Sequence, residues 1–347
     1  MPLRVPSTRL DGLDAARGVA VVSMLVAHLS PVGGPANVTE YLTAALFAVV
    51  IGVAMGVVLQ ERHPPTGTFL RDNALRGLVL VLLGVALQAL YAQIVVVLPH
   101  LGLLVIVLAP LALLLHRMQV LTLGVAGGLA VVSPVLMEHA RGWMAANPDA
   151  PAVLRQLVDW LVAGHSYRVL SLLAMALGGL ALSTVLRRAG QLPVAWAVGG
   201  VLLAASLAAY LLGAASPDGS AAYSGTTAEI VGATLLACGT VVLSFACLDT
   251  VRRIGAGRVA EPLLATGRLA LTAYTVQVLW LALLSLVRGG AADDSWWILG
   301  TSLLVVVGAC WALDRWVGTG PLEWLVHRVR FVREAAPGRH AVARRGA

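Results

Sequence analysis

Long apolar stretches recur along the whole chain and constrain its fold more than any other feature. Each is roughly 17–25 residues long, which is the length that an α-helix needs to cross a bilayer. The stretches are continuous and rich in Leu and Ala, whereas strands of a membrane barrel alternate apolar with polar residues. Of the 347 residues, 59% are hydrophobic and 12% are charged, about half the charged fraction of a soluble domain. The sequence therefore predicts an all-α protein, a polytopic transmembrane helical bundle.

We expect about ten spans of this length, because Pro and Gly residues punctuate most of the connections between apolar stretches. The predicted spans are 15–32, 41–60, 74–92, 97–116, 119–137, 167–187, 193–213, 227–249, 262–287 and 295–314.

The basic residues predict the orientation of these spans. All 24 are arginine, and they lie mostly at the ends of apolar stretches or in the C-terminal tail. With a cytoplasmic N-terminus, every Arg falls on the inner side except Arg141, Arg155, Arg168 and Arg288. This positive-inside pattern predicts that both termini are cytoplasmic. The pattern also argues against nucleic-acid binding, despite a net charge of +7. The absence of Lys, together with many Ala, Gly and Val, suggests a GC-rich bacterial genome and hence a bacterial inner membrane.

Residues 1–330 are predicted to form one transmembrane domain. The longest outer loop, 138–166, should carry a short helix that Pro151 opens and Asp149 caps, lying on the outer interface as a lid or simply on lipid. Residues 331–347 form a basic cytoplasmic tail that we expect to be disordered. A signal peptide over residues 1–36 is the competing interpretation of the N-terminus, but no small-x-small cleavage site follows it.

Three polar residues share one face of the first predicted span. Arg17 and His28 are eleven residues apart, within about 20° of three full helical turns and about 16 Å along the axis. Asp14 precedes Arg17 by three residues and joins the same stripe. Titratable groups on a span face the protein interior or a water-filled cavity. The alternative is that Asp14 and Arg17 only end the helix at the inner surface and that His28 is an ordinary interfacial residue.

Four segments resemble known families. "RLDGLDAARGVAVVSMLVAH" resembles the first helix of the acyltransferase-3 branch of the transmembrane acyltransferase superfamily, in which an Arg, ten residues and a His follow one another. "YSGTTAEIVGATLLACGTVVLSFACL", "GRLALTAYTVQVL" and "GTGPLEWLVHRV" are similar to segments of the domain-of-unknown-function 418 family. That family often has His-Ser where this chain has Tyr223-Ser224. It also resembles, more distantly, the lysosomal glucosaminide acetyltransferases, which move an acyl group from cytosolic acyl-CoA to a sugar across the membrane.

The resemblance implies a comparable reaction, with acyl-CoA as co-substrate and an envelope carbohydrate or lipid-linked acceptor. His28 is the candidate base or nucleophile, since a neutral imidazole can serve either role. Arg17 is the first candidate for the phosphates of acyl-CoA, followed by Arg71, Arg76 and Arg268. Glu229 could orient His28 or bind an acceptor hydroxyl, and it could equally just stabilise the start of its helix.

Further residues are candidates for the substrate cavity, and most have a simpler explanation. Arg71 and Arg76 could be anchors at the inner surface, and His100 a core histidine. Arg268 lies deep enough in its span that it should face the bundle, paired with Glu261 or a phosphate. The candidate cavity residues are Asp14, His100, Tyr223, Ser224 and Gln277. No histidines share a metal-ligand spacing, so we predict no metal.

Two other functions fit the same pattern. A transporter could use the Arg17–His28 stripe as a proton or substrate path, and a non-catalytic membrane subunit could retain the fold without the activity. The sequence indicates no oligomeric state.

Overall fold

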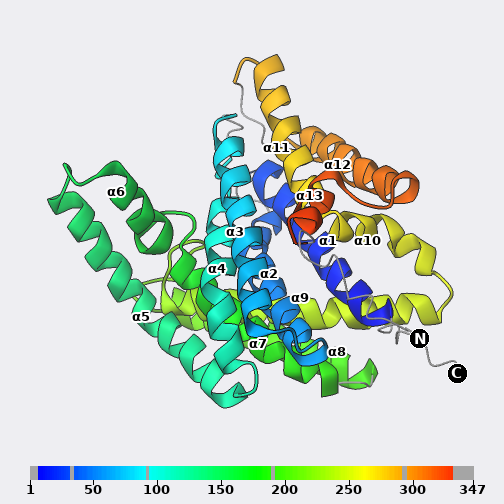
Figure 1. Ribbon diagram of the computed structural model, residues 1–347, viewed down its shortest axis with the longest axis horizontal. Helices are drawn as coiled ribbons and strands as arrows, with labels where there is room; N and C mark the ends of the chain where they lie inside the picture. Colours follow the sequence, from blue (N-terminus) through cyan, green and yellow to red (C-terminus); the bar gives the residue numbers. More distant parts are fainter. Residues whose placement is uncertain (1–6, 32–34, 91–93, 189–191, 291–294, 331–347) are drawn as a thin grey trace, which may run out of the picture.

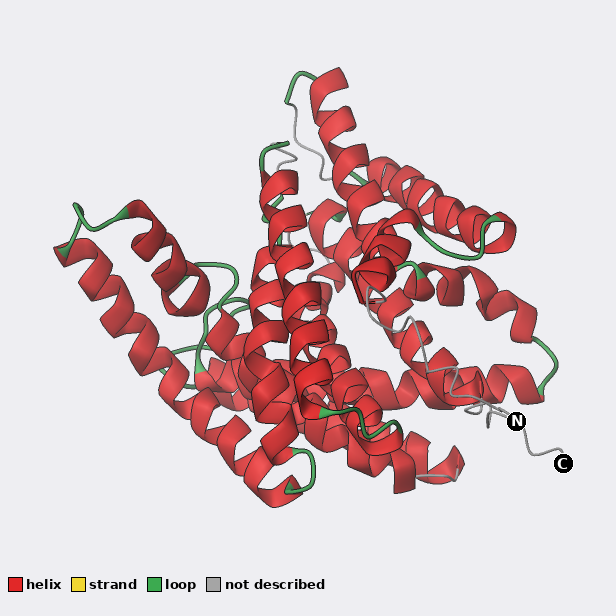
Figure 2. Cartoon of the chain, in the orientation of Figure 1, coloured by secondary structure: helices red, strands yellow, loops and turns green. Residues whose placement is uncertain are grey.

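The computed structural model describes residues 7–31, 35–90, 94–188, 192–290 and 295–330. These residues form thirteen α-helices and a few short 3₁₀ or π-helical turns, with no strand among them (Figures 1 and 2). The prediction of an all-α fold is confirmed.

Nine helices within the described part of the chain are long and apolar enough to cross a membrane. They are α1 (Ser7–Leu29), α2 (Val38–Glu61), α4 (Leu98–Leu115), α5 (Gln119–Ala146), α7 (Val169–Arg188), α8 (Leu192–Ala214), α9 (Thr227–Arg253), α11 (Ala270–Val287) and α12 (Trp296–Trp316). Helix α3 (Thr66–Gln88) is as long, but Arg71, Asp72 and Arg76 make its first half polar. With α3 the bundle agrees with the predicted number of spans.

Helices α1, α2 and α7 form the centre of the bundle, and α5, α8 and α12 lie at its edge. Most of each central helix is buried, whereas the edge helices expose apolar side chains such as Leu211 and Leu304. Gly52 of α2 lies directly against the main chain of Ala176 of α7, where a Cβ atom would collide with the carbonyl group. Such glycines allow two helices to approach backbone to backbone.

The outer connection between α5 and α7 differs from its prediction. Helix α5 continues to Ala146, because residues 138–146 are mostly good helix formers such as Ala, Glu, Arg and Met. The predicted short helix is α6 (Ala152–Val158), which runs into a π-helical turn, Asp159–Ala163. Pro151 occupies its N-cap position and no side chain caps it, so the prediction that Asp149 caps this helix was wrong. Val153, Leu154 and Leu157 are exposed, as an interfacial helix requires.

The predicted span 262–287 is two helices. Leu269 leaves the helical conformation and separates α10 (Glu261–Arg268) from α11. The new N-terminus of α11 is stabilised by Glu323 of α13 (Pro321–Arg330), whose carboxylate accepts hydrogen bonds from the amides of Leu271 and Thr272. The cap comes from a residue some fifty positions away, and the local sequence does not show it.

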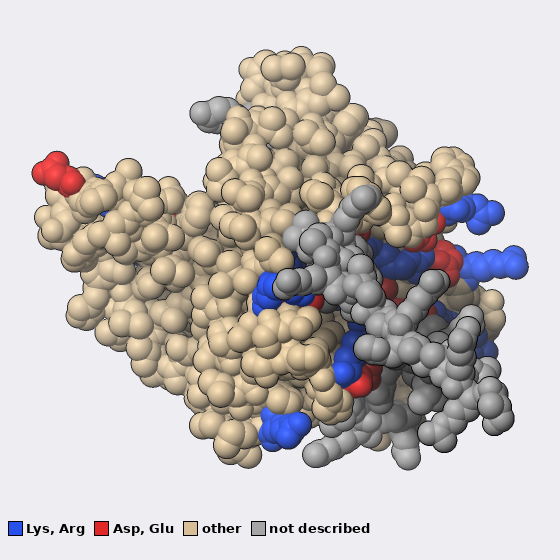
Figure 3. All heavy atoms as spheres, viewed as in Figure 1, with Lys and Arg blue, Asp and Glu red and all other residues tan. Residues whose placement is uncertain are grey.

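Charged side chains gather on one side of the bundle. Figure 3 shows arginines and their acidic partners at the right-hand and lower edge of the molecule, whereas most of the remaining visible face is uncharged. Ion pairs here include Arg252–Asp11 at 2.5 Å and Arg253–Asp249 at 2.9 Å. Asp11, Arg252 and Arg253 belong to segments predicted to be cytoplasmic, and Asp249 ends the predicted span 227–249. These pairs therefore lie where the predicted orientation places the inner surface, and that orientation stays a prediction.

Candidate functional site

A cavity of about 290 Å³ opens on the predicted cytoplasmic side between α1, α2, α3, α4 and α11. Its walls are mostly apolar, and guanidinium groups reach it from α1, α3 and α10. We call it the inner cavity; its lining residues are Arg17, Phe47, Val50, Ile51, Arg76, Leu80, Leu98, Leu101, Gly267, Arg268, Ala270, Leu271, Tyr274, Glu323 and Val326. An apolar cavity with a few convergent polar groups is the usual form of a ligand site.

Arg17 is held at this cavity by its neighbour on the same helix. Its Nη1 lies 2.6 Å from Oδ1 of Asp14, an ion pair one helical turn apart. Asp14 and Arg17 therefore share a face of α1, as predicted, and bind each other; that His28 belongs to the same stripe stays a prediction. Among the described residues, Asp14 is the hydrogen-bond partner of the Arg17 guanidinium. The remaining N–H groups of Arg17 can therefore donate to a ligand.

Arg268 is fixed more firmly. Its Nε and Nη2 donate to the two carboxylate oxygens of Asp314 at 3.0 and 2.6 Å, and Nη2 also contacts Glu261 at 3.2 Å. The hydrogen bonds to Asp314, followed by those to Glu261, raise the pKa of Arg268. The predicted pairing with Glu261 is confirmed. Asp314 was missed, although an acid near the end of an apolar span is a recognisable signal.

The two arginines of α3 separate. Arg76 lines the inner cavity, whereas Arg71 is not among its lining residues and pairs with the adjacent Asp72 at 3.0 Å. Five residues along a helix correspond to a rotation of about 140°, so the two side chains cannot share a face. Of the residues predicted to bind the donor, the fold thus brings together Arg17, Arg76 and Arg268.

Glu323 was not predicted, and it belongs to both the cavity and the cap of α11. Its Oε1 accepts from the amides of Leu271 and Thr272 at 2.9 and 3.0 Å, and its Oε2 lies 2.5 Å from Oγ1 of Thr272. Helix α13 is short and amphipathic, and its sequence alone does not show what it packs against. These hydrogen bonds attach it to α11, so that Glu323 and Val326 form part of the cavity wall.

A second, much smaller cavity of about 20 Å³ lies on the predicted outer side, between α2, α7 and the loop that precedes α9. We call it the outer cavity; its lining residues are Glu40, Tyr41, Ala44, Ala45, Ser166, Tyr167, Arg168, Ser171, Leu172, Met175, Tyr223 and Glu229. Carboxylates, tyrosines and one guanidinium are thus concentrated in a space of about one water molecule.

Arg168 is the most constrained cation described, only 3% exposed. Its Nη1 donates to the carbonyl of Gly164 and its Nη2 to the carbonyl of Tyr223, both at 2.9 Å, while its buried Nε has no partner. Burial lowers the pKa of Arg168, and the carboxylate of Glu229 partly offsets this. The sequence analysis used Arg168 only to predict the orientation of the spans and did not predict it as a site residue. Its position at the start of an apolar span on the outer side, against the positive-inside pattern, could have indicated a specific role.

The loop of residues 223–226 closes over this guanidinium. Tyr223 and Gly225 both have left-handed backbone conformations, with φ of 61° and 76°. A Cβ atom on Gly225 would lie 2.7 Å from the guanidinium carbon of Arg168, so only glycine fits there. The Tyr223 ring packs edge-to-face on Tyr167, with centroids 5.5 Å apart. Burial raises the pKa of Tyr167 to about 12, and it raises the pKa of Tyr223 too.

Glu229 lies at the start of α9 and is 5% exposed. Oγ1 of Thr226 accepts a hydrogen bond from the Glu229 amide at 3.2 Å, and the Glu229 carboxylate accepts one from the backbone of Gly225. Thr226 is thus the residue that caps α9. The two roles suggested for Glu229, stabilising the helix start and binding a partner, both stay predictions. Ser224 contributes through its hydroxyl, 3.1 Å from that of Thr226.

His28 lines neither cavity. It is half-buried near the outer end of α1, and its ring makes no hydrogen bond with any residue in the described part of the chain. The predicted use of Glu229 to orient His28 is therefore not seen as a hydrogen bond between them.

The two other polar candidates are buried. His100 is 5% exposed and packs against the rings of Tyr167 and Trp160, with centroids 5.7 and 6.0 Å away. It belongs to the aromatic cluster behind the outer cavity, and its Nδ1 has no partner. Gln277 is completely buried on α11, and neither atom of its amide has a partner among the described residues.

No group of three His, Cys, Asp or Glu side chains in the described ranges is arranged to hold a metal ion.

A comparison with curated proteins found no match. A family model described as an acyltransferase domain, Acyl_transf_3, matches residues 10–315, a range that contains nearly all of the ten long helices. This match supports a membrane acyltransferase in general. The chain therefore belongs to the acyltransferase-3 family of multi-pass membrane proteins.

Proposed function

We propose that this protein transfers an acyl group from cytoplasmic acyl-CoA to an envelope carbohydrate or lipid-linked acceptor at the outer face of a bacterial inner membrane. The observation that carries the proposal is the inner cavity, where Arg17, Arg76 and Arg268 converge on an apolar space from three helices. Membership of the acyltransferase-3 family supplies the reaction class, and the narrower resemblance to the domain-of-unknown-function 418 family is part of the same proposal.

The inner cavity has the two properties that an acyl-CoA site needs. The phosphates of the nucleotide require cations, and guanidinium groups bind phosphate through paired hydrogen bonds. The acyl and pantetheine arm requires an apolar channel, which Phe47, Val50 and Leu101 would line. Arg17 and Arg76 are the proposed phosphate ligands. Arg268 is committed to Asp314, so we assign it to shaping the mouth of the cavity.

We assign the chemistry to His28 and place the acceptor against the outer cavity, whose volume of about 20 Å³ would admit only a single acceptor hydroxyl or amine. A hydroxyl or amine of the acceptor attacks the thioester carbonyl, the C–S bond breaks, and coenzyme A leaves as a thiol. His28 would take the acceptor proton and deliver one to the sulfur, or would itself carry the acyl group between two such steps. Glu229, beside Arg168, would hydrogen-bond to the acceptor. These roles extend the resemblance residue by residue.

Radiolabelled acetyl-CoA and the purified full chain provide the test. We expect His28→Ala to abolish thioester cleavage while acetyl-CoA still binds. Arg76→Ala should raise the Kd for acetyl-CoA by about tenfold or more, because it removes a charge-assisted hydrogen bond. Arg71→Ala, on the same helix but outside the cavity, is the matched control and should bind normally.

Two results would contradict the proposal. Equal losses for Arg76→Ala and Arg71→Ala would mean that the inner cavity does not bind the donor. Flux of a substrate across the membrane without any acyl transfer would instead favour the transporter interpretation.

A further inference from the structure

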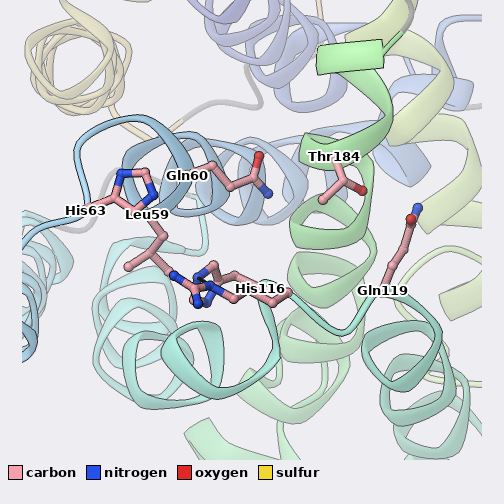
Figure 4. A pocket seen from close by; sticks show the side chains of 7 residues that line it. Leu59, Gln60, His63, His116, Gln119 and Thr184 are labelled. Carbon is pink, nitrogen blue, oxygen red and sulfur yellow. Dashed lines mark hydrogen bonds between the residues drawn. The ribbon is translucent and has the colours of Figure 1, made fainter.

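A third pocket lies on the predicted cytoplasmic side, where the ends of α2, α4 and α7 meet the start of α5 (Figure 4). It has a volume of about 280 Å³ and shares no residue with the inner cavity. We call it the inner-face pocket; its lining residues are Leu59, Gln60, His63, His116, Arg117, Gln119 and Thr184. Two imidazoles and a guanidinium line it, and none of these residues is acidic.

The cation of this pocket is held in place by a histidine. Nδ1 of His116 lies 3.1 and 3.0 Å from the carbonyl oxygens of Ala112 and Leu113, so in the neutral ring Nδ1 carries the proton. Nε2 of His116 is then an acceptor, and Nε of Arg117 donates to it at 3.2 Å. Within the described residues, the terminal Nη groups of Arg117 have no partner. They are positioned to bind an anion in the planar, two-pronged way that suits phosphate.

His63 adds a second group at the cost of backbone strain. It follows α2 with φ of 45°, a left-handed conformation that is unfavourable for any residue with a Cβ atom. Glycine would be the more stable choice at such a position. Its imidazole lines the pocket and has no hydrogen-bond partner in the described part of the chain. Strain of this kind is concentrated at ligand sites.

The opposite wall is polar and rigid. Oγ of Ser183 donates to the carbonyl of Leu180 at 2.7 Å, so it must accept the bond from Nε2 of Gln60 at 3.0 Å. Thr184 likewise donates to the carbonyl of Ala181 at 2.7 Å, which leaves its oxygen free to accept. Figure 4 shows Thr184 and Gln119 across the opening from His63. Headgroup hydroxyls therefore have acceptors within the same pocket.

The surface beside the pocket indicates the kind of molecule that brings the anion. Helices α4 and α5 expose Leu114, Met118, Val120 and Leu121 next to it, with Leu114 and Val120 70% and 86% exposed. In a membrane these side chains face lipid tails. A phosphate in the pocket can therefore be attached to acyl chains that lie along α4 and α5. Basic pockets between helices on the cytoplasmic side bind anionic headgroups in this way.

We propose that the inner-face pocket binds the phosphate headgroup of an anionic phospholipid of the inner leaflet. Arg117 and the imidazole of His63 contact the phosphate, and His116 holds Arg117 in position through its Nε2. Thr184 and Gln119 contact the headgroup hydroxyls. The inference is independent of acyl transfer, because none of these residues lines the inner or the outer cavity.

Native mass spectrometry of the full chain in detergent, titrated with phosphatidylglycerol, tests the proposal. Arg117→Gln should weaken binding about tenfold, the effect of losing a charge-assisted contact. His63→Gly should weaken binding about threefold without lowering the unfolding temperature, since it relieves the left-handed strain. Arg253→Gln, an inner-side arginine outside the pocket, is the control and should bind like the wild type.

Phosphatidylcholine and glycerol 3-phosphate distinguish the possible sources of the anion. The proposal requires that phosphatidylglycerol binds more tightly than phosphatidylcholine and that glycerol 3-phosphate competes weakly, in an Arg117-dependent manner. It is overturned if both lipids bind equally, if Arg117→Gln behaves like Arg253→Gln, or if glycerol 3-phosphate binds and phosphatidylglycerol does not.

Discussion

The inner and outer cavities use charge in opposite ways. In the inner cavity the arginines of α1 and α10 are paired with acids, remain partly exposed to solvent, and border a space of about 290 Å³. In the outer cavity Arg168 and Glu229 are almost fully buried around about 20 Å³. Exposed ion pairs are worth little and rearrange readily, whereas a buried charge that loses its partner is very costly. The inner site is thus built to exchange partners, and the outer one to hold the loops of 163–169 and 223–226 in place.

The largest effect is expected from the outer site. Arg168→Ala removes the buried positive charge that interacts with the Glu229 carboxylate. It also leaves the carbonyls of Gly164 and Tyr223 without their hydrogen-bond donor. It should lower the free energy of unfolding by about 3–5 kcal/mol, measured by denaturation in detergent.

Arg155, a partly exposed arginine on the same predicted side, provides the control for Arg168→Ala. It donates to the carbonyl of Pro148, and Arg155→Ala should cost less than about 0.5 kcal/mol. Pairing Arg168→Met with Glu229→Gln should recover part of the loss, because both charges are then removed. If Arg168→Ala were as stable as Arg155→Ala, the buried charge of Arg168 would not stabilise the fold.

Alanine substitutions at two glycines distinguish the cost of backbone strain from the cost of a steric clash with the Arg168 guanidinium. Gly219 and Gly225 have similar φ values of 70° and 76°, but only Gly225 lies against Arg168. Gly225→Ala should cost about 2–4 kcal/mol, the sum of strain and a steric clash. Gly219→Ala should cost about 1–2 kcal/mol, from strain alone. Thermal unfolding of both variants measures the difference, and equal losses would show that the loop does not press on Arg168.

On the inner side, Glu323 joins α13 to α11. Glu323→Ala should destabilise the protein by about 1–2 kcal/mol, because the first amides of α11 lose their acceptor. The Kd for acetyl-CoA should rise at the same time, since α13 forms part of the cavity wall. Glu323→Gln keeps an acceptor oxygen and should retain most of the stability. A Glu323→Gln variant as unstable as Glu323→Ala would show that charge, rather than hydrogen bonding, holds α13.

The smallest effect is expected from the partly exposed pair Arg268–Asp314. Asp314→Asn should cost no more than about 1 kcal/mol, because solvent and salt screen this pair. The loss should shrink further in 1 M salt, whereas the Arg168→Ala loss should not. A salt-insensitive loss of several kcal/mol for Asp314→Asn would remove the contrast between the two cavities.

The sequence alone determined the fold class and the approximate number of spans, and it predicts their orientation. It also showed that α9 begins near Glu229 and that Arg17 and Asp14 share a face. These features are local. A bilayer leaves the backbone of a spanning segment only a helix or a closed barrel, and the continuous apolar stretches exclude the barrel. Residue spacing along a helix then decides which side chains share a face. The same helical spacing places Arg71 and Arg76 on different faces of α3, although both were predicted to bind the phosphates of acyl-CoA.

Only the tertiary structure decided which of those faces meet. The inner cavity joins Arg17, Arg76 and Arg268 from helices that lie far apart along the chain, and the cap that Glu323 provides for α11 spans some fifty residues. The pairing of Arg168 with the loop of Tyr223 is equally remote. The periodicity of each helix indicates that it has an interior face. Which residues that face contacts depends on how all the helices pack together, because side-chain volumes and close backbone approaches such as Gly52 on Ala176 fix the arrangement.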